Sequence, residues 1–269
     1  MAERIYDAQF SGNAADNYER YFVPAIGGPL AADLVDAAAL KTGERVLDVA
    51  CGTGVVARLA AERVGETGRI AGSDINRSML EVARSLPAAG VSIEWHEADA
   101  ESLPHADESF DAVLCQMGLQ FVENKLAALR EMRRVLAAGG RAVINVPGPA
   151  PAPMAAFADA LGRHVGARAA AFIHLVFSLH DPGELRELLA AAGFRDTDVR
   201  RETKSLRVPP PEEFMWQYIY STPMAGALAE LDPQRRAALE RDVCAKWQDH
   251  CDDGALMLSV GMTTAIARK

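Results

Sequence analysis

The feature that most constrains the fold is an alternation of short apolar runs and helical patterns between residues 45 and 146. The runs are β-branched and apolar, as buried strands are: Arg45–Ala50, Arg69–Ser73, Val91–Glu97, Phe110–Cys115 and Arg141–Val146. Helical periodicity marks Val55–Val64, Ser78–Leu86 and Lys125–Leu136, and we expect the Gly139-Gly140 pair to end the last of these helices. Strands interleaved with helices at this spacing predict an α/β fold with a mostly parallel sheet and helices on both faces.

The flanking segments add further elements. A helical pattern runs over Leu30–Leu40, and Asp181 is expected to cap a helix that ends at Gly193. Phe194–Val208 and Ala255–Ala267 are predicted to be a sixth and a seventh strand. The predicted domains are an N-terminal helical arm (1–40), a core (41–208 and 254–269) and a helical lid inserted at 209–253.

Composition and charge exclude several classes of protein. A length of 269 residues with 49% hydrophobic residues suits one α/β domain with a lid. The net charge of −9 argues against nucleic acid as a partner, because binding to the phosphate backbone needs clustered Lys and Arg. No leader and no long apolar run is visible, so neither secretion nor a membrane partner is expected.

Cysteine spacing gives no metal or disulfide signal. The four cysteines, Cys51, Cys115, Cys244 and Cys251, form no C-x-x-C pair. We therefore expect no metal site, reduced thiols and a cytoplasmic location.

The strongest local signal is the segment LDVACGTG, residues 47–54, which connects a predicted strand to a predicted helix. Glycines at such a turn let the backbone approach a ligand closely. Gly52-x-Gly54-x-x-Ala57, with Asp74 about 20 residues further on, fits the dinucleotide fingerprint. One interpretation is therefore an NAD(P)-dependent oxidoreductase whose pyrophosphate lies on the helix end.

A second interpretation is a loop for S-adenosylmethionine, which has a cationic amino group and a sulfonium but no phosphate. Asp48 ends the first strand and can face the cationic part, whereas a pyrophosphate would gain nothing from it. Asp74 ends the second strand and can accept hydrogen bonds from ribose hydroxyls, and Asp99 follows the third, within reach of the adenine amino group. Acids at three successive strand ends lie at the edge where open α/β sheets bind ligands.

Four ordered segments make this second interpretation specific. LDVACGTG, GSDINRSMLEVAR, EADAESLPHADESFDAVLCQMGLQFV and ALREMRRVLAAGGRAVIN resemble segments of class I S-adenosylmethionine-dependent methyltransferases. The resemblance covers about residues 40–147 and is nearest to the small-molecule group typified by ubiquinone and menaquinone biosynthesis enzymes. It implies a Rossmann-like seven-stranded sheet whose last strand, around Gly261–Ala267, is antiparallel at the sheet's edge.

The resemblance also implies roles for individual residues. The implied cofactor-binding set is Asp48, Ala50, Gly52 and Gly54 at the methionine part, Asp74 at the ribose, Ile75 and Met79 against the adenine, Asp99 and Ala100 at the adenine edge, and Cys115 and Gln116 beside the methionine part or the methyl group. Ala50 departs from the family, which usually has Gly there. We expect Ala50 to be tolerated if its φ is negative.

Methyl transfer from a sulfonium is an in-line displacement that needs a base only if the nucleophile keeps its proton. The chain has six histidines, but none is singled out, so no catalytic residue is assigned. Aromatic residues outside the core segments suggest a small apolar or aromatic acceptor. Phe10, Tyr18 and Tyr21 are expected to fold over the cofactor, and Phe157, Phe172, Phe177, Phe214, Trp216, Tyr218 and Tyr220 to wall a pocket.

Two alternatives stay open beside the methyltransferase, and a homodimer is left open as its assembly. An oxidoreductase predicts an otherwise parallel sheet. A non-catalytic relative that binds the cofactor and acts through its lid surface predicts no open cavity beside the methyl group.

Overall fold

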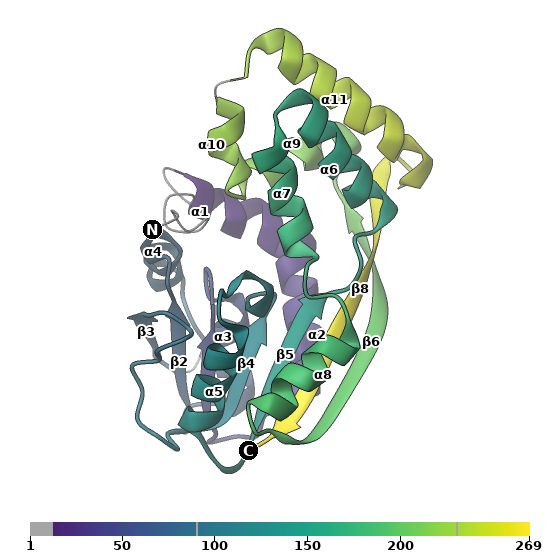
Figure 1. The fold of residues 1–269 in the computed structure, drawn as a ribbon. Coiled ribbons are helices and arrows are strands. Elements are labelled where there is room, and N and C mark those ends of the chain that lie inside the picture. Colours follow the sequence, from purple (N-terminus) through teal and green to yellow (C-terminus); the bar gives the residue numbers. More distant parts are fainter. Residues whose placement is uncertain (1–12, 90, 230) are drawn as a thin grey trace.

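The computed structural model describes residues 13–89, 91–229 and 231–269. It shows an open sheet flanked by helices, with a helical lid beyond one edge of the sheet (Figure 1). The strands are β1 Arg45–Val49, β2 Arg69–Asp74, β3 Ile93–Glu97, β4 Phe110–Gln116, β5 Leu136–Pro147, β6 Arg195–Val208, β7 Cys251–Asp252 and β8 Ala255–Arg268. Their order is β3-β2-β1-β4-β5-β8-β6, and the two-residue β7 pairs with β8.

The helices fall into three groups. The N-terminal arm comprises α1 Ala14–Asn17, the π-helix η1 Tyr18–Gly27 and α2 Gly28–Ala38. The sheet carries α3 Val55–Val64, α4 Arg77–Ser85, the 3-10 helix η2 Leu119–Phe121, α5 Lys125–Val135 and α8 Pro182–Ala191. The lid contains α6 Ala152–His164, α7 Ala167–Val176, α9 Pro211–Tyr220, α10 Met224–Ala229, α11 Pro233–Trp247 and the 3-10 helix η3 Gln248–His250.

The predicted parallel core is confirmed. β1 pairs in parallel with β2 and β4, β2 with β3, and β4 with β5. Side chains alternate across the sheet, so Leu47 and Val49 pack under α5 and α8 while Val46 packs under α2 and α3. Because the five strands β1 to β5 run the same way, their carboxyl ends meet at one edge, which faces the lid (Figure 1).

One local prediction was wrong. Gly139 and Gly140 do not end helix α5, which stops at Val135, but lie inside β5. Leu136 already has extended backbone and pairs with Phe110, and the register between β4 and β5 then shifts. Gly139 takes a φ of +76° there, so the glycine pair accommodates an irregularity in the strand.

The position of the last strand also needs correction. β8 is antiparallel, as predicted, but it lies between β5 and β6, and β6 forms the edge of the sheet. The ladder between β6 and β8 extends as far as the pair Val208 and Leu256, well beyond β5, and carries the lid at its end (Figure 1). This antiparallel strand disagrees with the parallel sheet expected of an oxidoreductase.

The lid has an apolar core of its own. Phe157 of α6, Phe214 of α9 and Trp247 of α11 pack together, and the Trp247 indole N–H donates to the Pro153 carbonyl at 2.7 Å. This core therefore includes α6 and α7, which lie outside the predicted lid boundaries 209–253. Among the described residues, no helix has the length and apolar character needed to cross a membrane.

Two glycines make room for Trp95 of β3. A Cβ added to Gly54 would lie 2.3 Å from the Trp95 ring, and one added to Gly72 would lie 2.4 Å from it. The indole therefore packs directly on the backbone of the glycine loop and of β2, which fixes the loop relative to the sheet.

We predict that Gly72→Ala lowers the free energy of unfolding by about 1–3 kcal/mol, because the added methyl group overlaps the rigid indole. Urea unfolding measures the change. Gly226→Ala is the control: Gly226 lies in α10 with nothing within 4 Å of an added Cβ, and Ala favours helix. A second substitution, Trp95→Leu, should recover part of the loss. Equal midpoints for Gly72→Ala and wild type would contradict this packing.

Candidate active site

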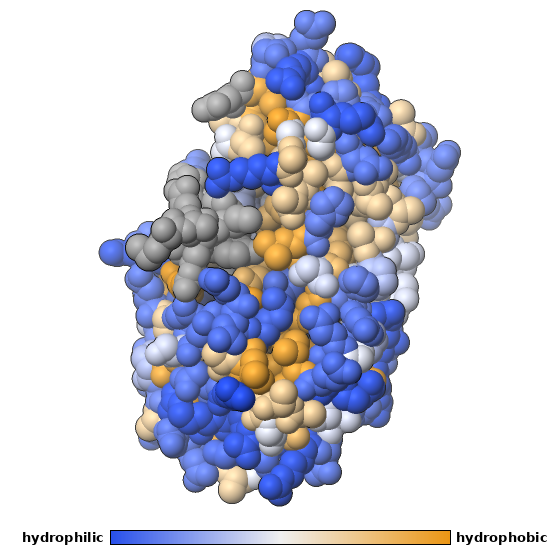
Figure 2. Space-filling model, viewed as in Figure 1, coloured by the Kyte–Doolittle hydropathy of each residue, from blue (hydrophilic) through white to orange (hydrophobic). Residues whose placement is uncertain are grey.

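A cavity of about 350 Å³ lies between the carboxyl ends of the strands and the lid. It is lined by Tyr18, Phe22, Ala50, Gly52, Asp74, Ile75, Asn76, Met79, Ala98, Asp99, Ala100, Glu101, Gln116, Met117, Gly118, Gln120, Phe121, Val122, Glu123, Phe172, Leu175, Val176, Tyr218, Thr222 and Pro223. Figure 2 shows apolar residues gathered on this face of the molecule, between the more polar surfaces of the lid and the sheet domain. The predicted residues Ala50, Gly52, Asp74, Ile75, Met79, Asp99, Ala100 and Gln116 thus come together at one cavity.

The glycine loop turns sharply between β1 and α3. Ala50, Gly52 and Gly54 all have left-handed backbone, with φ of +55°, +54° and +85°. The condition set for Ala50, a negative φ, is therefore not met, and the residue carries a strain of about 1–2 kcal/mol. Its methyl group fits against Gly118, where an added Cβ would lie only 2.5 Å from it.

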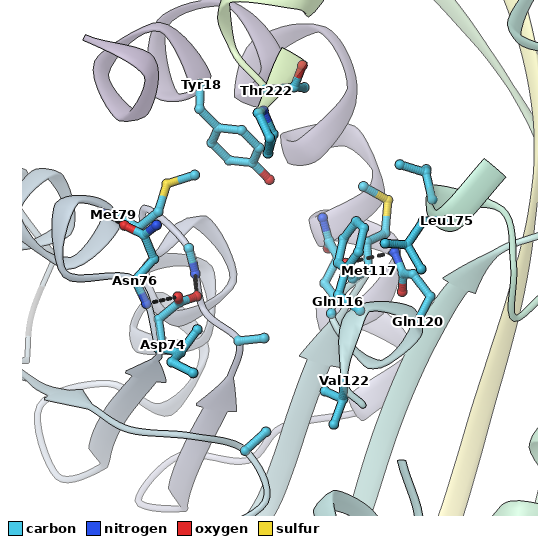
Figure 3. A pocket seen from close by; sticks show the side chains of 18 of the residues that line it. Tyr18, Asp74, Asn76, Met79, Gln116, Met117, Gln120, Val122, Leu175 and Thr222 are labelled. Carbon is cyan, nitrogen blue, oxygen red and sulfur yellow. Dashed lines mark hydrogen bonds between the residues drawn. The ribbon is translucent and has the colours of Figure 1, made fainter. Parts of the chain in front are cut away.

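Asp74 is held by backbone donors at the end of β2. Its Oδ2 accepts from the Gly52 N–H at 2.7 Å and its Oδ1 from the Asn76 N–H at 2.8 Å (Figure 3). Desolvation raises the pKa of this carboxyl group, and the hydrogen bonds from the backbone oppose that rise. The same residue thus fixes the loop and presents its carboxylate to the cavity, beside the exposed Ile75 and the buried Met79.

Three predicted residues, Asp48, Gly54 and Cys115, lie outside the cavity lining. Asp48 is 1% exposed and its Oδ2 accepts from the Ala57 N–H at 3.0 Å, so it caps the first turn of α3. Burial raises the pKa of the Asp48 carboxyl group well above its usual value and that of the Cys115 thiol to about 12. Gly54 faces Trp95. Asp48, Gly54 and Cys115 therefore lie behind the cavity wall and support it.

The end of β4 contributes Gln116. Its Nε2 donates to the Gly27 carbonyl at 2.8 Å, and its buried Oε1 has no hydrogen-bond partner within the described parts of the chain. On the opposite wall, Asp99 and Ala100 follow β3, and the Asp99 Oδ1 accepts from the Glu101 N–H at 2.9 Å.

The N-terminal arm covers the cavity. Tyr18 points its hydroxyl into the space between Asp74 and Gln116 (Figure 3). Burial, assisted by the nearby Asp74, raises the pKa of Tyr18, so this hydroxyl stays protonated at neutral pH. Tyr21 is not among the lining residues, and Phe10 lies outside the described residues.

An ion pair clamps this arm to the glycine loop. Arg58 of α3 contacts the Glu19 carboxylate at 2.7 Å and donates through its other nitrogen to the Thr53 carbonyl at 2.6 Å. The lid joins the same assembly, because the Ser221 hydroxyl donates to the Asn17 carbonyl at 3.0 Å.

The lid and the segment after β4 form an apolar wall. Phe172 and Tyr218, of the aromatic set predicted to wall a pocket, do line the cavity, whereas Phe157 and Phe214 belong to the lid core. Sequence reasoning missed other lining residues, which include Phe22, Met117, Phe121, Val122, Leu175, Val176 and Thr222. The run QMGLQFV after the fourth strand was the available signal, since residues that follow a parallel strand lie at the binding edge.

Four of the six histidines make contacts away from the cavity lining. His164 contacts Asp242 at 3.0 Å, His180 contacts the Phe177 carbonyl, and His96 packs edge-to-face on His105. None of them is among the described lining residues. No cluster of His, Cys, Asp and Glu suited to a metal ion occurs in the described part of the chain.

Comparisons with known proteins decide the family. Residues 46–140 match the model of a methyltransferase domain. The chain is 38% identical over 174 residues to the ubiquinone/menaquinone biosynthesis C-methyltransferase UbiE of Coxiella burnetii. The aligned region covers 59% of this chain and 70% of that protein. It is 35% identical to UbiE of Escherichia coli over 179 residues, with 61% and 71% covered.

The chain belongs to the class I S-adenosylmethionine-dependent methyltransferases, in the UbiE-like group. Its cofactor is S-adenosylmethionine and its reaction is methyl transfer. The fold agrees: phosphoethanolamine N-methyltransferase 2 of Haemonchus contortus, solved with S-adenosyl-L-methionine, superposes with a TM-score of 0.62 at 19% identity, covering 98% of this chain and 59% of that one.

In this methyltransferase, we predict that Gly118→Ala lowers the free energy of unfolding by about 1–3 kcal/mol. Gly118 has a φ of −109°, so its backbone suits Ala and the loss comes from overlap with the Ala50 methyl group. Ala50→Gly should restore more than half of that loss in the double variant, although the Cys115 sulfur still lies 3.1 Å from the new Cβ. Urea unfolding of the wild type, the two single variants and the double variant gives the interaction free energy between the two positions. Additive losses in the double variant would contradict the prediction.

We also predict that Arg58→Met weakens binding of S-adenosylhomocysteine by about 3- to 10-fold, because the arm loses a charge-assisted link of about 1 kcal/mol to the loop. Isothermal titration calorimetry measures the affinity. Arg63→Met is the matched control, since Arg63 lies on the same helix in an exposed ion pair with Asp36. Equal affinities of both variants would show that the clamp does not position the arm.

Proposed function

We propose that this methyltransferase transfers the methyl group of S-adenosylmethionine to a small apolar or aromatic acceptor bound under the lid. The observation that carries the proposal is a single cavity with two unlike walls. One wall presents Asp74 and Asp99 at the strand ends, and the other presents apolar side chains such as Phe172 and Leu175 of the lid. Such a cavity suits a polar cofactor and an apolar acceptor side by side.

The nucleoside part of the cofactor would occupy the wall formed by β2 and β3. Asp74 is proposed to accept hydrogen bonds from the ribose hydroxyls, and its backbone donors keep the carboxylate in place for this. Ile75 and Met79 would pack against the adenine. Asp99 and Ala100 would contact the adenine edge, since they line the same wall.

The methionine part would lie over Ala50 and Gly52, beside Gln116. The observation that supports this placement of the methionine part is the Gln116 Oε1, a buried acceptor without a partner among the described residues. The ammonium group of the cofactor carries the donors that this oxygen lacks. Asp48, Gly54 and Cys115 are proposed to act behind this wall, by holding the loop and β4 in position.

The acceptor would occupy the lid side, against Met117, Phe121, Phe172, Val176 and Tyr218. These side chains favour an apolar molecule and keep water from the reacting atoms. Tyr18, which stays protonated, would close the cavity over both ligands.

S-adenosylmethionine supplies a methyl group activated by its sulfonium. The acceptor atom would form its bond to the methyl carbon as the carbon–sulfur bond breaks, and the electron pair of that bond would stay on sulfur, which gives S-adenosylhomocysteine. The protein's part is to hold the acceptor atom about 3 Å from the methyl carbon in line with the departing sulfur. Among the described residues, no histidine or cysteine lines the cavity, so we assign neither type as a base. We propose that the protein orients the acceptor and excludes water.

The alternatives fit less well. An NAD(P)-dependent oxidoreductase was expected to have an otherwise parallel sheet, but β8 is antiparallel to both of its long neighbours. A non-catalytic relative was expected to have no open cavity beside the methyl group, but the cavity continues from Asp74 to the lid. A cytoplasmic location, the absence of a nucleic-acid partner and a homodimeric assembly stay predictions.

We predict that Asp74→Ala weakens binding of S-adenosylhomocysteine by about 10- to 100-fold, because hydrogen bonds to a charged group contribute about 1.5–3 kcal/mol. Calorimetric titration with S-adenosylhomocysteine and with NAD measures both affinities. Asp36→Asn, an exposed residue remote from the cavity lining, is the control, and thermal unfolding checks that each variant is folded. Binding of NAD alone by the wild-type protein would overturn the proposal.

A further inference from the structure

Gln120 is a buried amide in the apolar wall of the cavity. It lies in η2, is 1% exposed and lines the cavity beside Phe121. Its Nε2 donates to the Met117 carbonyl at 2.9 Å, and its Oε1 has no hydrogen-bond partner within the described residues. Because a carbonyl can only accept, this bond decides which end of the amide is nitrogen.

The unpartnered oxygen is also shielded from water, so solvent does not satisfy it. A buried acceptor without a donor costs free energy, and such atoms are rare in native proteins. The last torsion of a glutamine side chain has a broad energy profile, so the Gln120 amide can turn within the cavity wall of which it is part.

The backbone close to Gln120 is strained at Met117. Met117 has a φ of +47°, which a non-glycine residue rarely adopts. Its N–H is held by the Asn145 backbone carbonyl at 2.9 Å and by the Asn145 Oδ1 at 3.2 Å. Strained residues of this kind persist where the surroundings hold them, often at functional sites. Here the strained turn brings both Gln116 and Gln120 to the cavity (Figure 3).

We propose that Gln120 determines acceptor specificity by accepting a hydrogen bond from a hydroxyl or N–H group of the acceptor. The acceptor is then an apolar molecule that carries at least one donor. This inference rests on the proposed function. No described group donates to this oxygen, and the lining residues Phe121, Phe172 and Val176 carry no donor on their side chains, so we assign its donor to the ligand.

The cofactor also carries hydrogen-bond donors, so the donor to each glutamine has to be assigned to the cofactor or to the acceptor. The positions of Gln116 and Gln120 allow this assignment. Gln116 lies at the end of β4, beside the loop that we assign to the methionine part. Gln120 lies four residues further along, next to the aromatic contact between Phe121 and Phe172 of the lid, whose ring centroids are 6.3 Å apart. We therefore assign the cofactor ammonium to Gln116 and the acceptor donor to Gln120.

The test compares two probes of nearly equal shape, 2-naphthol and 2-fluoronaphthalene, of which the first has a donor. Equilibrium dialysis in the presence of saturating S-adenosylhomocysteine gives both affinities. The wild-type protein should prefer 2-naphthol, and the ratio of the two affinities should fall about tenfold in Gln120→Met, through weaker binding of 2-naphthol alone. Met has nearly the length and volume of Gln, so packing is conserved.

Two further variants localise the effect. Gln217→Met, on α9 outside the cavity lining, should keep the wild-type ratio. Gln116→Met should weaken binding of S-adenosylhomocysteine and keep the ratio, whereas Gln120→Met should leave S-adenosylhomocysteine binding unchanged.

The outcomes distinguish the two levels of the proposal. If wild type binds S-adenosylhomocysteine but shows no preference for 2-naphthol, or if Gln120→Met keeps the preference, the role of Gln120 is overturned while the proposed function stands. If wild type does not bind S-adenosylhomocysteine, the proposed function fails and this inference with it. The wild-type comparison holds even if a variant does not fold.

Discussion

The turn between β1 and α3 is the constraint on which the site depends. The chain must leave the strand and enter the helix within the few residues from Ala50 to Gly54 without covering the strand ends. Left-handed backbone at Ala50, Gly52 and Gly54 achieves this. Since Ala50 is not a glycine, its methyl group needs space, and Gly118 supplies that space from the segment after β4. The glycine loop and the segment after β4 are therefore coupled by direct packing.

The lid is coupled to the same loop through the arm. Its main insertion leaves the sheet at the end of β6 and returns at the start of β8, and Val208 and Leu256 are neighbours in that ladder. An insertion with adjacent ends disturbs the sheet little. Contacts from Ser221 to the arm, and from Glu19 through Arg58 to the loop, then link the two closing elements to the part of the site that they cover.

The sequence predicted the parallel sheet, and eight of its predicted site residues line one cavity at the edge of that sheet. Short β-branched, apolar runs between helical patterns predict the parallel strands, and acids such as Asp74 at their ends reach one edge because parallel strands share direction. The sequence did not predict the order of β8 and β6, which depends on pairing between distant segments, or the inclusion of α6 in the lid core. The sequence also predicts that Asp48 holds the methionine part of the cofactor, and this stays a prediction, because a pattern cannot tell a carboxylate at a ligand from one that caps a helix.

The wall after β4, to which we assign the acceptor, was hardest to predict, because it depends on backbone strain at Met117, which no periodicity records. Under the proposed function, the strained turn at Met117 helps to position the acceptor. An in-line displacement needs the acceptor atom about 3 Å from the methyl carbon, and a small displacement slows it steeply. A short segment anchored to β4 and β5, with Gln116 at one end and Gln120 at the other, can hold both partners against the same rigid sheet.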